Sequence, residues 1–185
     1  GIFRAITALM LLAPGTPMIF QGQEFAASSP FLYFVDLRHD LEELVRRGRL
    51  EFLAQFPSLA GTNSVFMSDT GVGSFTRSKL DLNERLGHGH VYGLYKDLLK
   101  LRKDDPVFSL QRQRGMDGAV LSGNAFVLRY FGIEGNDRLV IVNLGSDLRL
   151  NSMPEPLLAP PIWGKWELMW SSEDYRYGGL GTRII

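Results

Sequence analysis

Residues 16–25 read TPMIFQGQEF, and this stretch decides how the rest of the chain is interpreted. Four apolar residues, Pro17 to Phe20, lead directly into amides and a carboxylate. A run this apolar predicts a strand at 17–20 that is buried on both faces, as in a parallel sheet. In parallel α/β folds, functional groups collect just beyond the carboxyl ends of the strands. We therefore expect Gln23 and Glu24 to lie on a functional face, with bonding to neighbouring loops as the alternative.

The residues before this stretch predict a helix over 2–13 that is apolar nearly all round. Only Arg4 and Thr7 interrupt its apolar surface, so we expect the helix to be buried inside a larger protein. Pro14-Gly15 should end it. The apolar region is too short to span a bilayer and is interrupted by prolines, so no membrane role is expected. Exposed strand edges and apolar residues in 1–56 would instead favour self-association.

Composition excludes several classes of function. The 185 residues carry 20 Lys+Arg and 20 Asp+Glu, a formal net charge of +0, which argues against nucleic acid as a partner. The absence of cysteine excludes disulfides and thiolate zinc sites and fits a cytoplasmic location. His88-Gly89-His90 lacks companion ligands, so we predict no metal site, and no cofactor motif is found.

The middle of the chain predicts two amphipathic helices joined by a long connection. The first covers 38–55 and the second 89–103, which Asp104-Asp105-Pro106 should end. Residues 57–88 show little periodicity and predict an irregular connection. The apolar positions of the two helices are Leu41, Leu44, Val45, Phe52 and Leu53, then Val91, Leu94, Tyr95, Leu98 and Leu101.

After Pro106 the periodicity changes to that of β-structure. Strand-like runs begin near residues 118, 124, 138 and 165, and turn signals at 122–124 and 135–137 separate the first three. We therefore predict an α+β chain that ends in an antiparallel β domain. Trp163, Trp166, Trp170 and Tyr175 could stack on sugars, but filling the core of this domain is the favoured interpretation.

Glu173 and Asp174 are a candidate pair of catalytic acids. Adjacent residues on an extended chain point in different directions, however, so a turn is favoured over paired acids.

Several motifs resemble the α-amylase-type glycoside hydrolases. The G-x-P-x-x-x-x-G-x-E pattern from Gly15 to Glu24 is shared widely among them. The stretches "SSPFLYFVDL", "SFTRSKLDLNE", "YGLYKDLLKLRKDDP" and "WSSEDYRYGG" are similar to the maltooligosyltrehalose trehalohydrolase branch in particular. The resemblance covers essentially the whole chain and identifies it as a C-terminal portion of such an enzyme.

The resemblance implies a fold in three parts. Residues 1–56 would be the last helix and strand of a (β/α)8 TIM barrel, 57–106 a connector loop and helix, and 107–185 an antiparallel β-sandwich. The catalytic carboxylates of the family sit on barrel strands that would precede Gly1, so no catalytic residue is assigned to this chain. Gln23 and Glu24, with Phe31, Phe34 and Asp36 as a wall of the sugar cleft, are the substrate-binding residues that the resemblance suggests.

Two functions follow as hypotheses. The first is the C-terminal fragment of a retaining hydrolase that cleaves the α-1,4 bond beside a terminal trehalose unit of maltooligosyltrehalose, inactive by itself. The second is a non-catalytic module that binds α-glucan or a partner chain.

Overall fold

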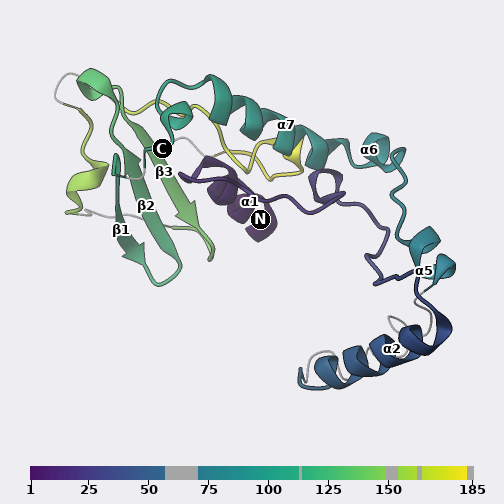
Figure 1. Cartoon of the computed structure of the whole chain (residues 1–185). Coiled ribbons are helices and arrows are strands. Elements are labelled where there is room, and N and C mark those ends of the chain that lie inside the picture. The colour runs from purple at the N-terminus through teal and green to yellow at the C-terminus, as the bar shows by residue number, and fades with distance from the viewer. Residues whose placement is uncertain (57–70, 113, 149–153, 162–163, 183–185) are drawn as a thin grey trace. The chain divides into compact units, whose positions relative to one another are not determined.

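The computed structural model describes residues 1–56, 71–112, 114–148, 154–161 and 164–182 (Figure 1). They form two compact units: the sheet unit, Gly1–Phe25 with His88–Ile185, and the α2 unit, Ala26–Gly87. The described residues contain α-helices and an antiparallel sheet, so the predicted α+β class is confirmed. The helices are α1 (Ile2–Leu12), α2 (His39–Leu53), α5 (Val72–Arg77), α6 (Glu84–Gly87) and α7 (Gly89–Asp104), and the strands are β1 (Met116–Ser122), β2 (Ala125–Tyr130) and β3 (Arg138–Asn143).

In the sheet unit, α1 packs against α7 and β3. Leu11 and Leu98 are fully buried in the core between these elements, where each buried leucine contributes about 1.5–3 kcal/mol. The helix α1 is buried on one face only, because Ile2, Phe3 and Ile6 are about half exposed. Burial of the whole helix inside a larger protein, which the sequence led us to expect, stays a prediction.

The sheet has the order β1-β2-β3, and both strand pairs are antiparallel. Gly123 and Asn124 form the two-residue connection between β1 and β2 at the predicted turn. Side chains alternate between the two faces, as the strand period requires. Leu128 and Tyr130 face the core shared with α1 and α7, whereas Val127 belongs to a smaller cluster on the opposite face.

Two predicted strands do not form. Residues 16–20 carry no strand, and Met18 and Phe20 are exposed. Residues 164–171 likewise have no strand, although Trp166 and Trp170 are half-buried. A strand needs a hydrogen-bonded neighbour, and a local apolar pattern does not supply one. The described β-structure is thus a three-stranded sheet.

The described residues of the α2 unit form three helices. The predicted helix 38–55 is confirmed as α2, and α5 and α6 lie within the connection that was expected to be irregular, so that expectation is wrong for 72–77 and 84–87. Residues 57–70 of this connection lie outside the described residues. Leu32 anchors the segment before α2, because its backbone N–H donates to the buried Ser78 hydroxyl at 2.9 Å.

The boundaries of the two compact units differ from those of the three predicted domains. Helix α7, expected in the connector, shares its core with α1 and the sheet. The division at residues 56 and 106 remains a prediction.

Candidate functional site

The segment that leads to the candidate site is held in place by Arg102 on α7. Its guanidinium donates to the carbonyl oxygens of Leu11 at 2.6 Å and Ala13 at 2.9 Å, and also to that of Gly15. It donates at 2.6 Å to the Gln111 side chain, which in turn accepts from the Gly15 N–H at 3.2 Å. A cation at the C-terminal end of α1 satisfies carbonyls that the helix leaves without partners. Arg102 therefore fixes the start of the segment that contains the candidate site.

Gln23 opens the short 3-10 helix Gln23–Phe25 and uses both ends of its side chain for the local fold. Its Oε1 accepts from the Phe20 N–H at 3.1 Å, and its Nε2 donates to the Tyr95 hydroxyl at 2.9 Å. Tyr95 is 1% exposed, so Gln23 satisfies a buried hydroxyl on α7. Gly22 has a φ of 79° and makes the tight turn before this short helix. This geometry is the bonding role that the sequence left open as the alternative for Gln23.

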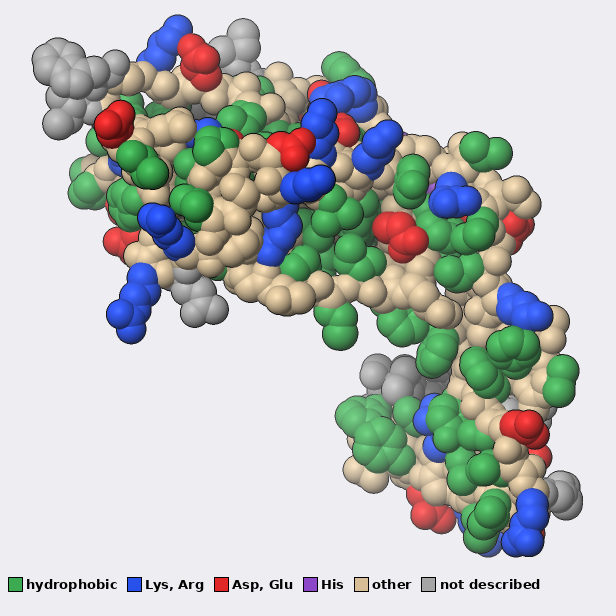
Figure 2. Space-filling view, turned by 45° about the horizontal axis from the view of Figure 1, so that its top comes forward, with side chains coloured by type: hydrophobic (Ala, Val, Ile, Leu, Met, Phe, Trp, Pro, Cys, Tyr) green, Lys and Arg blue, Asp and Glu red, His purple; other side chains and the backbone are tan. Residues whose placement is uncertain are grey.

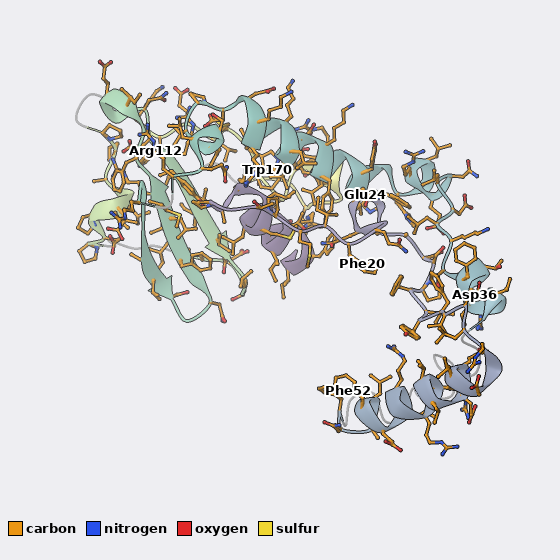
Figure 3. The ribbon with its side chains drawn as sticks, viewed as in Figure 1. Phe20, Glu24, Asp36, Phe52, Arg112 and Trp170 are labelled. Atoms are coloured by element: carbon orange, nitrogen blue, oxygen red, sulfur yellow. The ribbon has the colours of Figure 1, made fainter. Side chains whose placement is uncertain are left out.

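Glu24 differs from Gln23 in its hydrogen bonding. Its side chain is half-buried, and among the residues that the structure describes it makes no hydrogen bond or ion pair. Figure 3 shows Glu24 next to α7. The next residue, Phe25, is buried, and its carbonyl lies 2.9 Å from the His88 ring nitrogen Nδ1. The backbone around Glu24 is thus anchored while its carboxylate remains available to a ligand.

The other predicted site residues lie in the α2 unit, where aromatic rings form a chain of edge contacts. The rings of Phe31 and Phe34 are 6.4 Å apart, and Phe34 meets Phe75 at 5.1 Å. Lys79 lies over the Phe75 ring with its Nζ 4.7 Å from the centroid. All three phenylalanines are partly exposed. Phe75 and Lys79 were not predicted, although the resemblance in "SFTRSKLD" covered both positions.

Asp36 follows these aromatics on an exposed stretch before α2 (Figure 3). Within the described part of the chain, its carboxylate has no hydrogen bond or ion pair. Exposed phenyl rings can stack on the apolar faces of sugars, and carboxylates accept hydrogen bonds from sugar hydroxyls. The five predicted residues therefore fall into two sets, Gln23 and Glu24 in the sheet unit and the other three in the α2 unit.

Glu173 and Asp174 lie in a turn, as the sequence favoured, and both have structural partners. Glu173 pairs with Arg4 on α1 at 2.7 Å, and Arg4 also donates to the backbone carbonyls of Ser172 and Gly178. The hydrogen bond from Arg4 holds the pKa of Glu173 below its usual range. Asp174 accepts from the backbone and side chain of Arg176, which lowers its pKa as well. Glu173 thus fixes the C-terminal turn to α1, and Asp174 stabilises the turn itself.

The tryptophans contribute to packing in the sheet unit. Trp170 packs on the main core and donates to the Tyr177 hydroxyl at 3.2 Å, and Trp166 donates to the Leu158 carbonyl at 2.8 Å. This agrees with the favoured packing interpretation for these two residues. Trp163 lies outside the described residues, and Tyr175 is exposed, so it does not fill the core.

Neither a metal-binding cluster nor a membrane-spanning helix is found in the described ranges. No group of three or more histidine, aspartate or glutamate side chains there is placed to hold a metal ion. No helix in those ranges combines the length and the apolar character needed to cross a bilayer. His88 instead precedes α7 and contacts the backbone of Phe25.

Comparisons with known proteins match two parts of this description. A family model described as "Domain of unknown function (DUF3459)" matches residues 113–184. A protein from Salmonella typhimurium, whose crystal structure is described as that of an alpha amylase, superposes with a TM-score of 0.65 at 25% identity. The superposition covers 82% of this chain and 26% of the other.

Curated relatives extend the similarity across both compact units. Malto-oligosyltrehalose trehalohydrolase of Deinococcus radiodurans is 39% identical over 149 residues, which is 77% of this chain and 23% of the relative. The enzyme of the same name from Arthrobacter ramosus is 34% identical over 122 residues, or 64% of this chain and 21% of the relative. The chain thus spans less than a quarter of these relatives. It is homologous to the C-terminal region of malto-oligosyltrehalose trehalohydrolase, a member of the α-amylase family.

Proposed function

We propose that this chain forms the C-terminal part of a retaining glycoside hydrolase that releases trehalose from maltooligosyltrehalose. The 39% identity to the Deinococcus radiodurans enzyme over 149 residues is the observation that carries this proposal. In this proposal the catalytic carboxylates come from a region that the chain does not contain. Cleavage with retention needs two carboxyl groups about 5 Å apart, and the chain supplies loops around such a pair.

We assign α1 and residues 16–25 to the last helix and strand of the catalytic barrel. The exposed apolar side chains support this assignment, because Ile2, Phe3 and Ile6 on α1 are about half exposed and Met18 after it is 88% exposed. The neighbouring barrel elements would bury them. The three-stranded sheet would then belong to a larger C-terminal β-sandwich, as in the resemblance.

Within the site, Glu24 would bond substrate hydroxyls while Gln23 holds its backbone in place. The difference in their hydrogen bonding supports this division. Gln23 uses both ends of its amide within the chain, whereas the Glu24 carboxylate makes no hydrogen bond to the residues that the structure describes. In the α2 unit, taken by itself, Phe31 and Phe34 would stack on sugar rings, and Asp36 would accept hydrogen bonds from sugar hydroxyls. Maltooligosyltrehalose is accordingly the partner that we propose.

The test uses the gene from which this chain derives, expressed at full length and as residues 1–185. The full-length protein should release trehalose from maltooligosyltrehalose, and residues 1–185 alone should show no hydrolysis above background. Replacing Glu24 by alanine in the full-length protein should lower kcat/KM by about tenfold or more, with an unchanged melting temperature. Trehalose release by residues 1–185 that is lost in Glu173→Gln would refute the assignment.

The second candidate function is a glucan-binding module without catalysis. The partly exposed rings of Phe31, Phe34 and Phe75 favour it, because aromatic platforms of this kind bind sugars. Calorimetric titration of residues 1–185 with maltoheptaose distinguishes the two. Tight binding by the chain alone, abolished in a Phe34→Ala variant, would favour the module, whereas no binding would favour the enzyme fragment.

A further inference from the structure

We propose that α2 is a self-docking surface that pairs antiparallel with α2 of a second copy of this chain. The helix carries an exposed apolar stripe, defined here as Leu41, Leu44, Gly48 and Phe52. Leu44 is 61% exposed and Phe52 57%, and none of the described side chains of α2 is buried. Figure 2 shows hydrophobic side chains on the surface of the unit that holds this helix, and Figure 3 labels Phe52. Helical faces of this composition are normally covered.

The residues of the stripe before Leu44 complement in size those at similar distances after it. In an antiparallel pair that crosses at Leu44, a residue before this point meets one at a similar distance after it in the other copy. Leu41, three residues before, then lies beside Gly48, four residues after. Phe52, eight after, then faces the start of the other helix, which begins at His39. A large side chain thus faces a small one where Leu41 meets Gly48, and Gly48 lets the helices approach closely.

The charges beside the stripe follow the same two-fold pattern with opposite signs. Asp40 lies four residues before Leu44 and Arg47 three after it, so each would meet the other across the crossing. Arg38 lies six residues before and Glu51 seven after, which gives a second pair of opposite charges. The pattern is therefore complementary to its own reverse in charge as well as in shape.

The present partners of these charges do not compete strongly. Arg38 and Asp40 form an ion pair at 3.0 Å, but their side chains are 79% and 64% exposed. Arg47 is 4.0 Å from Glu43 and is also exposed. Exposed pairs of this kind contribute little to stability, so they can exchange partners on docking.

A second copy fits this surface better than an unrelated protein does. A two-fold interface uses the same patch on both subunits, so its patch must be complementary to itself. An unrelated partner would place no such requirement on the order of residues. The contact lies within residues 1–56, where the sequence led us to expect self-association. The proposed hydrolase function does not enter this inference.

Sedimentation equilibrium of residues 1–185 over a concentration series tests the proposal. We expect reversible dimerisation that Leu44→Glu abolishes, because two carboxylates would meet at the crossing. Leu86→Glu is the matched control, since Leu86 is also exposed in the α2 unit but lies outside the stripe. Ile6→Glu is the control for the exposed face of α1.

A charge exchange tests the orientation with variants that should all fold, because the residues are exposed. Asp40→Arg or Arg47→Asp should each raise the dimer dissociation constant by about tenfold, and the double variant should restore it. The chain has no cysteine, so Leu44→Cys should form an intermolecular disulfide on oxidation while Leu86→Cys does not. A monomer at all concentrations, a dimer lost in Ile6→Glu but not in Leu44→Glu, or no restoration by the double variant would overturn the proposal.

Discussion

Replacing Arg102 by methionine should separate the contribution of its hydrogen bonds from that of its aliphatic stem. Methionine keeps a long apolar side chain on α7 but cannot donate to the carbonyls at the end of α1. Hydrogen bonds from a charged donor are worth about 1.5–3 kcal/mol each, and a buried acceptor left without a partner costs about 1–3 kcal/mol. Arg102 serves the Leu11 and Ala13 carbonyls in partly buried positions, and its contact with Gly15 is exposed. Because such terms overlap, we expect the free energy of unfolding to fall by about 2–4 kcal/mol.

Urea denaturation followed by tryptophan fluorescence is the suitable assay. All three tryptophans lie between residues 163 and 170, so their emission reports on the sheet unit even if the α2 unit unfolds separately. Lys103→Met is the matched control, because Lys103 is the exposed neighbour in the last turn of α7. It should change stability by about 0.5 kcal/mol or less. A loss below about 1 kcal/mol for Arg102→Met, or equal losses for both variants, would refute the reasoning.

Three further substitutions test other polar contacts. The pKa of Glu173 is depressed below its ordinary value of 4.5, so its ion pair with Arg4 stabilises the fold above that pH and is lost as the pH falls through the depressed pKa. Between about pH 5 and pH 3, the free energy of unfolding should therefore fall more steeply in the wild type than in Glu173→Gln. Parallel curves for the two proteins would contradict this. Asp105→Ala should cost about 3 kcal/mol in chemical denaturation, since Asp105 accepts from two backbone N–H groups and pairs with Arg138 at 2.8 Å, whereas the exposed Asp104→Ala should be nearly neutral. Gln23→Ala should lower the free energy of unfolding by about 1–2 kcal/mol, because it removes the hydrogen bond to the buried Tyr95 hydroxyl on α7. An unchanged denaturation midpoint would show that Gln23 does not stabilise the fold.

Local periodicity predicted the helices well. The spacing of apolar residues in α2 and α7, and Asp104-Asp105-Pro106 at the end of α7, are signals that depend only on nearby sequence. The Gly123-Asn124 turn between β1 and β2 is equally local. The prediction of a strand at 17–20 was wrong because a strand depends on hydrogen-bonded neighbours that its own sequence does not specify. The same argument applies to residues 164–171, where the half-buried tryptophans pack without a ladder.

The candidate site was less accessible to sequence reasoning. The position of Gln23 and Glu24 after an apolar run marked both residues, but nothing nearby distinguished their roles. The partner of Gln23 is Tyr95, 72 residues away, and only the tertiary structure brings them together. Tyr95 could be read from the sequence only as one apolar position of a helix. Likewise, Phe75 joins Phe34 through a contact between residues far apart in the chain.

The C-terminal turn and the candidate site are coupled through α1. Arg4, near the start of α1, binds Glu173 and the carbonyls of Ser172 and Gly178, and Arg102 holds the opposite end of the same helix. The buried face of α1 packs in a core that also contains Tyr130 of β2. A change in the C-terminal turn would therefore act on α1 and, through the end that Arg102 holds, on the segment that carries Glu24. The sheet and the segment that carries Gln23 and Glu24 therefore contact the same packed core.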